Sequence, residues 1–282
     1  MRHSLSLVLG LCLAFGLAAC NKTPSDNQVQ SAINDASAAE QSNINELMLS
    51  VSDPNESVIF FSNATKNNPE DPVLKRYLGK ALLRAGKADQ AVRILTDLVN
   101  SAGATDEDRL ALAEAQIRSS DWKGAEATLA TIPPTVETYD RYRLEAMVAD
   151  SKKQWKKSDS FYEIAAGLTA QPANVLNNWG FSKLQRGDAK GAERLFLEAL
   201  SYDPTMFTAK NNLVLARAAQ RQYDLPVVSM NQAEKAQLLY TAGLAAIKQG
   251  DVAVGKQLLQ QAIDTSPQYF EAASRSLAAL GG

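Results

Sequence analysis

Histidine, cysteine and net charge are all scarce in this sequence. Its 282 residues include one histidine and two cysteines, and 29 lysines and arginines nearly balance 31 aspartates and glutamates, which gives a net charge of −2. A chain so close to neutral has no excess of basic surface to hold a phosphate backbone, so we expect no nucleic-acid partner. The mean hydropathy of −0.22 excludes a protein with several membrane-spanning segments.

The first twenty residues have the pattern of a secretory signal. A basic Arg2 precedes an apolar run from Leu5 to Leu17, which is too short to span a bilayer as a stable helix. The run ends in Leu-Ala-Ala-Cys, which resembles the lipobox of bacterial lipoproteins, in which the cysteine is acylated and becomes the new N-terminus. We predict a cleaved signal peptide over residues 1–19 and lipidation of Cys20. An ordinary signal-peptidase site is the alternative.

The residues after Cys20 predict where the anchor places the chain. In lipoproteins of this kind an aspartate after the cysteine favours the inner membrane, and by that resemblance Asn21 favours the outer membrane. Residues 20–37 are predicted to be the lipidated cysteine and a flexible polar tether, because they have no apolar periodicity. We therefore expect a lipid-anchored protein at the periplasmic face of the outer membrane.

Processing at this position also removes the side chains on which much enzyme chemistry depends. His3 and Cys12 lie in the predicted signal peptide, and acylation consumes the thiol of Cys20. The mature chain then excludes a Ser-His-Asp triad, a cysteine nucleophile, an imidazole or thiolate metal site and any disulfide. Carboxylate, lysine, tyrosine and hydroxyl chemistry stay open, but we expect no enzymatic activity, no cofactor and no metal.

An internal repeat of about 34 residues runs along the chain. Three columns of residues recur with the same successive spacings of 34, 34, 33, 34, 34 and 29. The first is Asn45, Gly79, Ala113, Ala146, Gly180, Val214 and Gly243; the second is Ser57, Ala91, Ala125, Ser158, Ala192, Pro226 and Gly255; the third is Phe61, Leu95, Leu129, Tyr162, Phe196, Met230 and Leu259. The pattern resembles that of tetratricopeptide (TPR) repeats.

The repeat predicts an all-α fold. We expect a right-handed superhelical TPR solenoid of about seven helix pairs over residues 38–282, ending in a capping helix over 270–280. In the unit over residues 173–206, Gly180 would let the second helix approach closely. Trp122, Trp155 and Trp179 are expected in the core of the repeats and not on a binding surface.

The period is interrupted near residues 224–231. A second helix is due there, but Pro226 occupies the small helix-contact column, and Val227 and Val228 follow it. Proline disfavours helix at the residue before it, and the Val-Val pair favours extended backbone. The sequence predicts an extended segment, which is either a docking element for a partner, built on Pro226, Val227 and Val228, or a deleted turn.

Asparagines at the repeat spacing are candidates for binding a peptide. Asn177 and Asn178 stand 34 residues before Asn211 and Asn212, in successive first helices. An asparagine amide can pair with both the N–H and the C=O of an extended peptide, and we add Phe181 to the same candidate groove. The alternative is helix capping or solvation. Arg76, Lys80 and Arg84 form a basic stripe, interpreted as a solvated face. The alternative is a surface that receives an acidic peptide or lipid headgroups.

A narrower resemblance rests on four stretches of the C-terminal half. They are residues 177–183 with Arg186-Gly187-Asp188, residues 209–213, residues 225–228 and residues 272–277. With the lipobox and the TPR pattern, they resemble the TadD lipoproteins of tight-adherence (Flp) pilus assembly systems. That resemblance implies a pilotin-like role in assembling or localising the outer-membrane secretin, and it implies no catalytic residues.

The sequence is therefore consistent with three functions. The leading one is a scaffold whose partners are secretin or other pilus-assembly proteins. A second is an accessory of outer-membrane β-barrel assembly, which shares the lipobox and the TPRs. A peptidoglycan-cleaving enzyme that uses paired carboxylates is less favoured, because the repeats leave no residual domain to house a catalytic site.

Overall fold

The computed structural model describes residues 40–281, which fall into two compact units divided between Ser52 and Asp53. In the first unit, residues 40–50 form a helix. The signal peptide, Cys20 and the tether lie outside the described residues, so these remain predictions, as does the start of the solenoid at residue 38. The second unit, from Asp53, carries the features discussed below.

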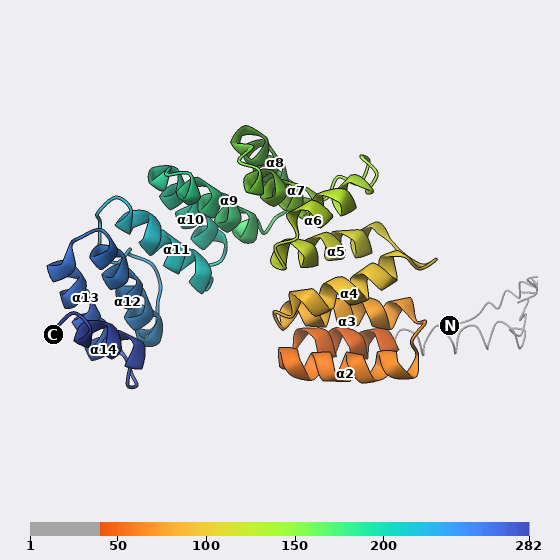
Figure 1. Cartoon of the computed structure of the whole chain (residues 1–282), viewed down its shortest axis with the longest axis horizontal. Coiled ribbons are helices and arrows are strands. Elements are labelled where there is room, and N and C mark those ends of the chain that lie inside the picture. The colour runs from red at the N-terminus through yellow and green to blue at the C-terminus, as the bar shows by residue number, and fades with distance from the viewer. Residues whose placement is uncertain (1–39, 282) are drawn as a thin grey trace, which may run out of the picture. The chain divides into compact units, whose positions relative to one another are not determined.

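The second unit is a succession of antiparallel helices, each packed on the next along the chain (Figure 1). The first helices of successive pairs are α3 (Pro72–Arg84), α5 (Asp106–Arg118), α7 (Tyr139–Ser151), α9 (Ala173–Gln185) and α11 (Phe207–Ala218). The second helices are α2 (Pro54–Asn67), α4 (Ala88–Val99), α6 (Trp122–Ala130), α8 (Trp155–Gly167) and α10 (Ala189–Tyr202). The unit ends with α12 (Gln232–Lys248), α13 (Val252–Thr265) and α14 (Glu271–Ala278). In the described range all regular secondary structure is helical, as predicted.

Side-chain caps set where several helices begin. The carboxylates of Asp53 and Asp71 accept backbone N–H groups at the starts of α2 and α3, each followed by a proline at the first helical position. Thr105 and Asn231 begin α5 and α12 with reciprocal capping boxes. Because each cap satisfies N–H groups that the helix itself leaves unpaired, each contributes about 1 kcal/mol.

One residue with left-handed backbone follows each of the helices α3, α5, α7, α9, α11 and α12. The backbone angle φ is positive at Gly86, Gly187 and Gly250, and also at Ser120, Lys153 and Arg221. These six positions follow the repeat spacing of the sequence. Glycine adopts this conformation without steric cost, whereas the other three residues are strained there.

In the second unit the residues of the three repeat columns are buried, apart from Met230, which is half-buried. In the third column Phe61, Leu95, Phe196 and Leu259 have no exposed surface, and the ring of Tyr162 is 1% exposed. A Cβ atom on Gly180 would lie 2.6 Å from the ring of Phe196, so the glycine is needed for the close approach of α9 and α10. The helix-pair fold and the close approach are therefore confirmed.

The last helices close the apolar core at the C-terminal end. Ala273 of α14 is fully buried, and Phe270 packs against a cluster built from α11, α12 and α13. This is the position of the predicted capping helix.

No helix is present between Ala218 and Gln232, where the period of the sequence is interrupted. Arg221 still forms the left-handed turn that follows a first helix. Pro226 is buried, and Val228 donates its backbone N–H to the carbonyl of Pro226 at 3.0 Å. The segment therefore keeps the turn of the repeat and replaces the second helix with non-helical chain.

The first helices contact one another as well as their own partners. Contacts join α3 to α5, α5 to α7, α7 to α9, and α9 to α11. We call the surface lined by these five helices the first-helix face. All the asparagines of the candidate groove lie on α9 and α11.

Candidate functional site

Polar side chains join each first helix to the next. The bonds are Arg76 to Asp108, Arg143 to Glu114, Ser182 to Asp150, Asn212 to Asn177, and, from α11 to α12, Lys210 to Glu234 and Thr241 to Asn211. Because these groups are partly or fully buried, each bond is stronger than it would be in water. The bonds fix the spacing of the first helices and therefore the geometry of the face they line.

The pair Arg76–Asp108 shows that the basic stripe is not simply solvated. The guanidinium of Arg76 donates twice to the carboxylate of Asp108, at 2.6 and 2.7 Å, and Asp108 is 1% exposed. Burial raises the pKa of Asp108, but the bonds from Arg76 and from the Thr105 cap outweigh it and hold the pKa below the usual range. Lys80 lies 5.8 Å from the ring centroid of Tyr77.

The candidate asparagines divide into two kinds. Asn177 and Asn212 are 9% and 8% exposed, and the amide of Asn212 donates to that of Asn177 at 3.0 Å. Asn178 and Asn211 are half-buried. The amide of Asn178 lies 3.8 Å from the sulfur of Met147, and that of Asn211 accepts from Thr241 at 2.8 Å. Asn178 is therefore the candidate whose amide keeps the most capacity for a ligand.

A groove crosses the first-helix face over α5, α7 and α9. It consists of two cavities of about 360 and 230 Å³ that share Met147 and Asn178. The larger is lined by Glu114, Ile117, Arg118, Tyr139, Arg143, Leu144, Met147, Asn174 and Asn178. The smaller is lined by Trp122, Met147, Asp150, Ser151, Tyr162, Asn178, Phe181 and Gln185. We call the two together the first-helix groove.

The charges in the larger cavity are paired with one another. Glu114 accepts from Arg118 at 2.5 Å and from Arg143 at 3.0 Å. Burial raises the pKa of Glu114, but the two arginines outweigh it and lower the pKa. This end of the groove holds α5 and α7 together and offers little uncompensated charge.

The smaller cavity has unusually exposed aromatic walls. Phe181 is 44% exposed and Trp122 is 36% exposed. The prediction that Trp122 lies in the repeat core was wrong. Trp122 is the first residue of α6, and its ring lines the cavity beside Met147 and Asp150 of α7. Trp155 and Trp179 are half-buried.

Asp150 also lines this cavity, and it is not among the candidate residues predicted from the sequence. Its carboxylate accepts three hydroxyl hydrogen bonds, from Ser158 at 2.5 Å, Ser182 at 2.7 Å and Tyr162 at 3.0 Å. Burial raises the pKa of Asp150, and the hydroxyl bonds offset this only in part. A signal was present in the sequence, because the equivalent positions of the other repeats are apolar: Leu83, Ile117, Leu184, Ala218 and Ile247.

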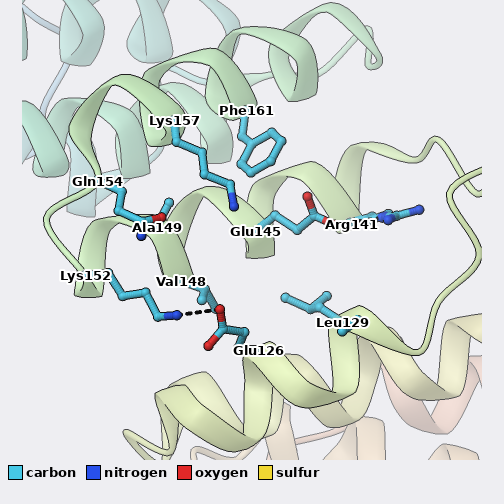
Figure 2. Close-up of a pocket in the computed structure, with 11 residues that line it drawn as sticks. Glu126, Leu129, Arg141, Glu145, Val148, Ala149, Lys152, Gln154, Lys157 and Phe161 are labelled. Carbon is cyan, nitrogen blue, oxygen red and sulfur yellow. Dashed lines mark hydrogen bonds and ion pairs between the residues drawn. The ribbon is translucent and has the colours of Figure 1, made fainter.

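A further cavity, of about 220 Å³, lies over α7 between α6 and α8 (Figure 2). Its charged groups have partners within it: Lys152 is ion-paired with Glu126, and Arg141 with Glu145 at 2.8 Å. Lys157 lies 5.5 Å from the ring centroid of Phe161, from the same helix. None of the candidate residues predicted from the sequence lines this cavity, so we place the candidate site at the first-helix groove.

The candidate docking segment has one fully exposed apolar residue. Val227 is fully exposed, while Val228 packs against the core cluster of α9, α10 and α11. Leu225 and Met230 pack against the cluster of α11 to α14. The segment is thus held at both ends, and its role in docking stays a prediction.

Residues 40–281 contain neither a cluster of metal ligands nor a membrane-spanning helix. No group of three or more His, Cys, Asp or Glu side chains there is arranged to hold a metal ion. No helix in that range has the length and apolar character to cross a membrane.

Comparisons with known proteins identify the fold. No family model and no curated protein matches the sequence. A TPR protein from Parabacteroides merdae has a similar structure, with a TM-score of 0.54 and 13% identity over 82% of this chain and 93% of that one. A thermophilic TPR protein from Thermus thermophilus has a TM-score of 0.50 and 16% identity over 62% and 95% of the two chains. The APC/C hetero-tetramer Cut9–Hcn1 has a TM-score of 0.58 and 16% identity over 80% of this chain, which spans 46% of that one. The fold is that of a TPR solenoid.

Proposed function

We propose that this chain is a non-enzymatic scaffold that binds a polypeptide segment in its first-helix groove. The groove is the observation that supports binding: it exposes Phe181 beside the half-buried amide of Asn178. An apolar side chain next to an amide suits an extended peptide, which presents both side chains and backbone polar groups. Solenoids of stacked helix pairs commonly use such extended surfaces for binding.

The partner is a segment of a secretin or of another subunit of a tight-adherence pilus system, with a lipid on Cys20 holding the scaffold at the outer membrane. The resemblance to TadD lipoproteins supports this partner, and the lipobox supports the anchor. A tether would raise the effective concentration of the groove near the membrane, so even modest affinity for a secretin segment would favour its assembly there.

Deleting the gene and following secretin multimers in membrane fractions tests this function. We expect fewer multimers at the outer membrane, restored by the wild-type chain but not by Cys20→Ala or Phe181→Glu. Ile164→Glu is the matched control, because Ile164 is also exposed, at 40%, and lies outside both cavities of the groove. Unchanged amount and location of the secretin would contradict the proposal.

Two further outcomes point to the alternatives. Co-purification with a barrel-insertion complex, and not with pilus components, would favour a role in β-barrel assembly. Glycan cleavage by the purified mature chain would overturn the assignment as a scaffold.

A further inference from the structure

The smaller cavity of the first-helix groove contains a carboxylate that the chain leaves without a cation. Within residues 40–281, no lysine or arginine forms an ion pair with Asp150. Arg186 acts on it from a distance, but its guanidinium is bonded to Asp159 at 2.5 Å. Within the described residues, the side-chain hydrogen bonds that Asp150 accepts therefore all come from neutral hydroxyl groups.

Other carboxylates that lie between the first helices are each paired with an arginine or a lysine. Asp108 has Arg76 and Glu114 has Arg143, and Lys210, 3% exposed, lies 3.1 Å from Glu234. Those pairings balance the cost of removing a carboxylate from water. At Asp150 the cost is balanced only in part, because burial raises the pKa of its carboxyl group despite the hydroxyl bonds.

The other repeats have no carboxylate at this position. The equivalent side chains Leu83 and Ile117 are apolar and buried, at 7% and 5% exposed. At residue 150 a carboxylate stands in this apolar column, bonded to three hydroxyls and to no cation. A charged group without a charged partner in an otherwise apolar column is typical of a functional position.

The walls of the cavity suit the rest of a basic side chain. Trp122 and Phe181 provide exposed aromatic surface, and Met147 provides an apolar, adaptable wall. Long basic side chains bury their methylene groups against apolar surface. Their cationic ends are attracted both to aromatic rings and to carboxylates.

We propose that the cavity formed by Trp122, Phe181 and Asp150 binds a positively charged side chain, lysine or arginine, of the polypeptide segment in the first-helix groove. This inference rests on the proposed function and adds a specificity to it. The Asp150 carboxylate has one lone-pair site left beside its three hydroxyl bonds, and this site accepts one N–H of the cation. The groove beside Asn178 holds the flanking backbone.

The test is a titration of short acetylated and amidated peptides of glycine, serine and alanine with one central arginine, lysine, citrulline or glutamate. The chain is labelled with ¹⁵N at tryptophan, and the indole resonance of Trp122 reports binding at this cavity. We expect saturable shifts with the arginine and lysine peptides and at least about fivefold weaker binding of the citrulline and glutamate peptides, the effect of losing one charged hydrogen bond.

Variants separate the charge from the walls. Asp150→Asn should weaken binding of the arginine peptide by about fivefold or more while the circular dichroism spectrum stays unchanged. Phe181→Ala, at an exposed position, should weaken the binding of the arginine and citrulline peptides by the same factor. Glu163→Gln, which removes an exposed charge on α8, is the matched control and should change nothing.

Specific outcomes would overturn the inference. Equal binding of the citrulline and arginine peptides, arginine binding unaffected by Asp150→Asn, or no shift at millimolar peptide would each do so. Binding of all the peptides regardless of charge would overturn the basic pocket and leave the scaffold function standing. If peptide binding depends on charge but the secretin is unchanged in deletion cells, the basic pocket stands and the proposed role in secretin assembly is overturned.

Discussion

The side-chain amide of Asn212 on α11 donates to the amide oxygen of Asn177 on α9 at 3.0 Å, and both side chains are more than nine-tenths buried. Truncating either one leaves the other's amide buried without its partner, which costs about 1–3 kcal/mol of unfolding free energy. We expect Asn177→Ala and Asn212→Ala each to destabilise by this amount, and the double variant to cost less than the sum.

Urea unfolding of the wild type, both single variants and the double variant measures this coupling. Asn174→Ala is the matched control, because Asn174 is an exposed asparagine on the same helix. It should change the unfolding free energy by less than about 0.5 kcal/mol. Strictly additive effects of the two substitutions would contradict an energetic link between α9 and α11.

The contact between Arg76 and Asp108 should make the chain sensitive to acid. The folded state holds the pKa of Asp108 below its unfolded value, so the stabilisation is present above about pH 4 and is lost as the pH falls through the folded pKa. We expect Asp108→Asn to cost about 2–3 kcal/mol near neutral pH, because Arg76 is 24% exposed and keeps some solvent.

Thermal unfolding of both proteins across acid and neutral pH checks this expectation. The gap between the wild type and Asp108→Asn should shrink towards low pH. Glu163→Gln, which removes an exposed carboxylate, should run parallel to the wild type throughout. A gap that stays constant with pH would mean that the carboxylate's charge contributes nothing.

The repeat columns could be predicted from the sequence because they depend only on spacing and side-chain size. Gly180 and Phe196 had to meet once two helices of this length were packed together, and they do. The pairing of Asn177 with Asn212 was not predictable in the same way. Adjacent residues such as Asn177 and Asn178 point to different neighbours. Which of them meets α11 depends on how α9 is rotated about its axis.

The candidate site shows the same division. Asp150 was visible in principle as a carboxylate in an apolar column. Its three hydroxyl donors were not, because Ser158, Tyr162 and Ser182 come from two other helices. The exposure of Trp122 could not be predicted from the sequence either. The burial of a tryptophan at the start of a helix depends on which neighbouring helix covers it.

A methyl group at residue 180 should disturb the contact between α9 and α10. Its carbon would lie 2.6 Å from the Phe196 ring, which is fully buried, so the ring or the helices must shift. We expect Gly180→Ala to cost about 1–3 kcal/mol in urea unfolding, in spite of the better helix propensity of alanine.

The control for this substitution is another helical glycine. Gly167 of α8 has no neighbouring atom within 4 Å of the position of an added Cβ, so Gly167→Ala should be neutral or stabilising. Adding Phe196→Leu to Gly180→Ala should recover part of the loss, because the smaller side chain vacates the space. Equal effects of the two alanine substitutions would show that packing against Phe196 is not the cause.

The strained turn residue Lys153 offers a stabilising substitution. Its φ of 57° lies in the left-handed region that Gly187 occupies in the next repeat. We expect Lys153→Gly to raise the unfolding free energy by about 0.5–1 kcal/mol and Lys153→Val to lower it, because a β-branched side chain fits this backbone worst. Glu163→Gly, in the middle of α8, should instead cost about 1 kcal/mol. A loss of stability in Lys153→Gly would contradict this account of the turn.

Asp150 should affect stability with the opposite pH dependence from Asp108. Burial raises the pKa of the Asp150 carboxyl group, so between its unfolded and folded pKa values the folded chain binds more protons than the unfolded chain. The contribution of this group to stability therefore falls as the pH rises through that window. The groups around it are the hydroxyls of Ser158, Tyr162 and Ser182 and the more distant charge of Arg186.

Asparagine at residue 150 does not titrate, so the stability of Asp150→Asn relative to the wild type should improve as the pH rises from about 4. Asp108→Asn should instead become worse relative to the wild type as the pH rises towards about 4, and its gap should stay level above that, because the pKa of Asp108 is lowered. Thermal unfolding of the three proteins in one series of buffers measures both slopes. Slopes of the same sign would mean that Asp150, like Asp108, has its charge compensated within the folded chain, and the need for an external cation at this cavity would disappear.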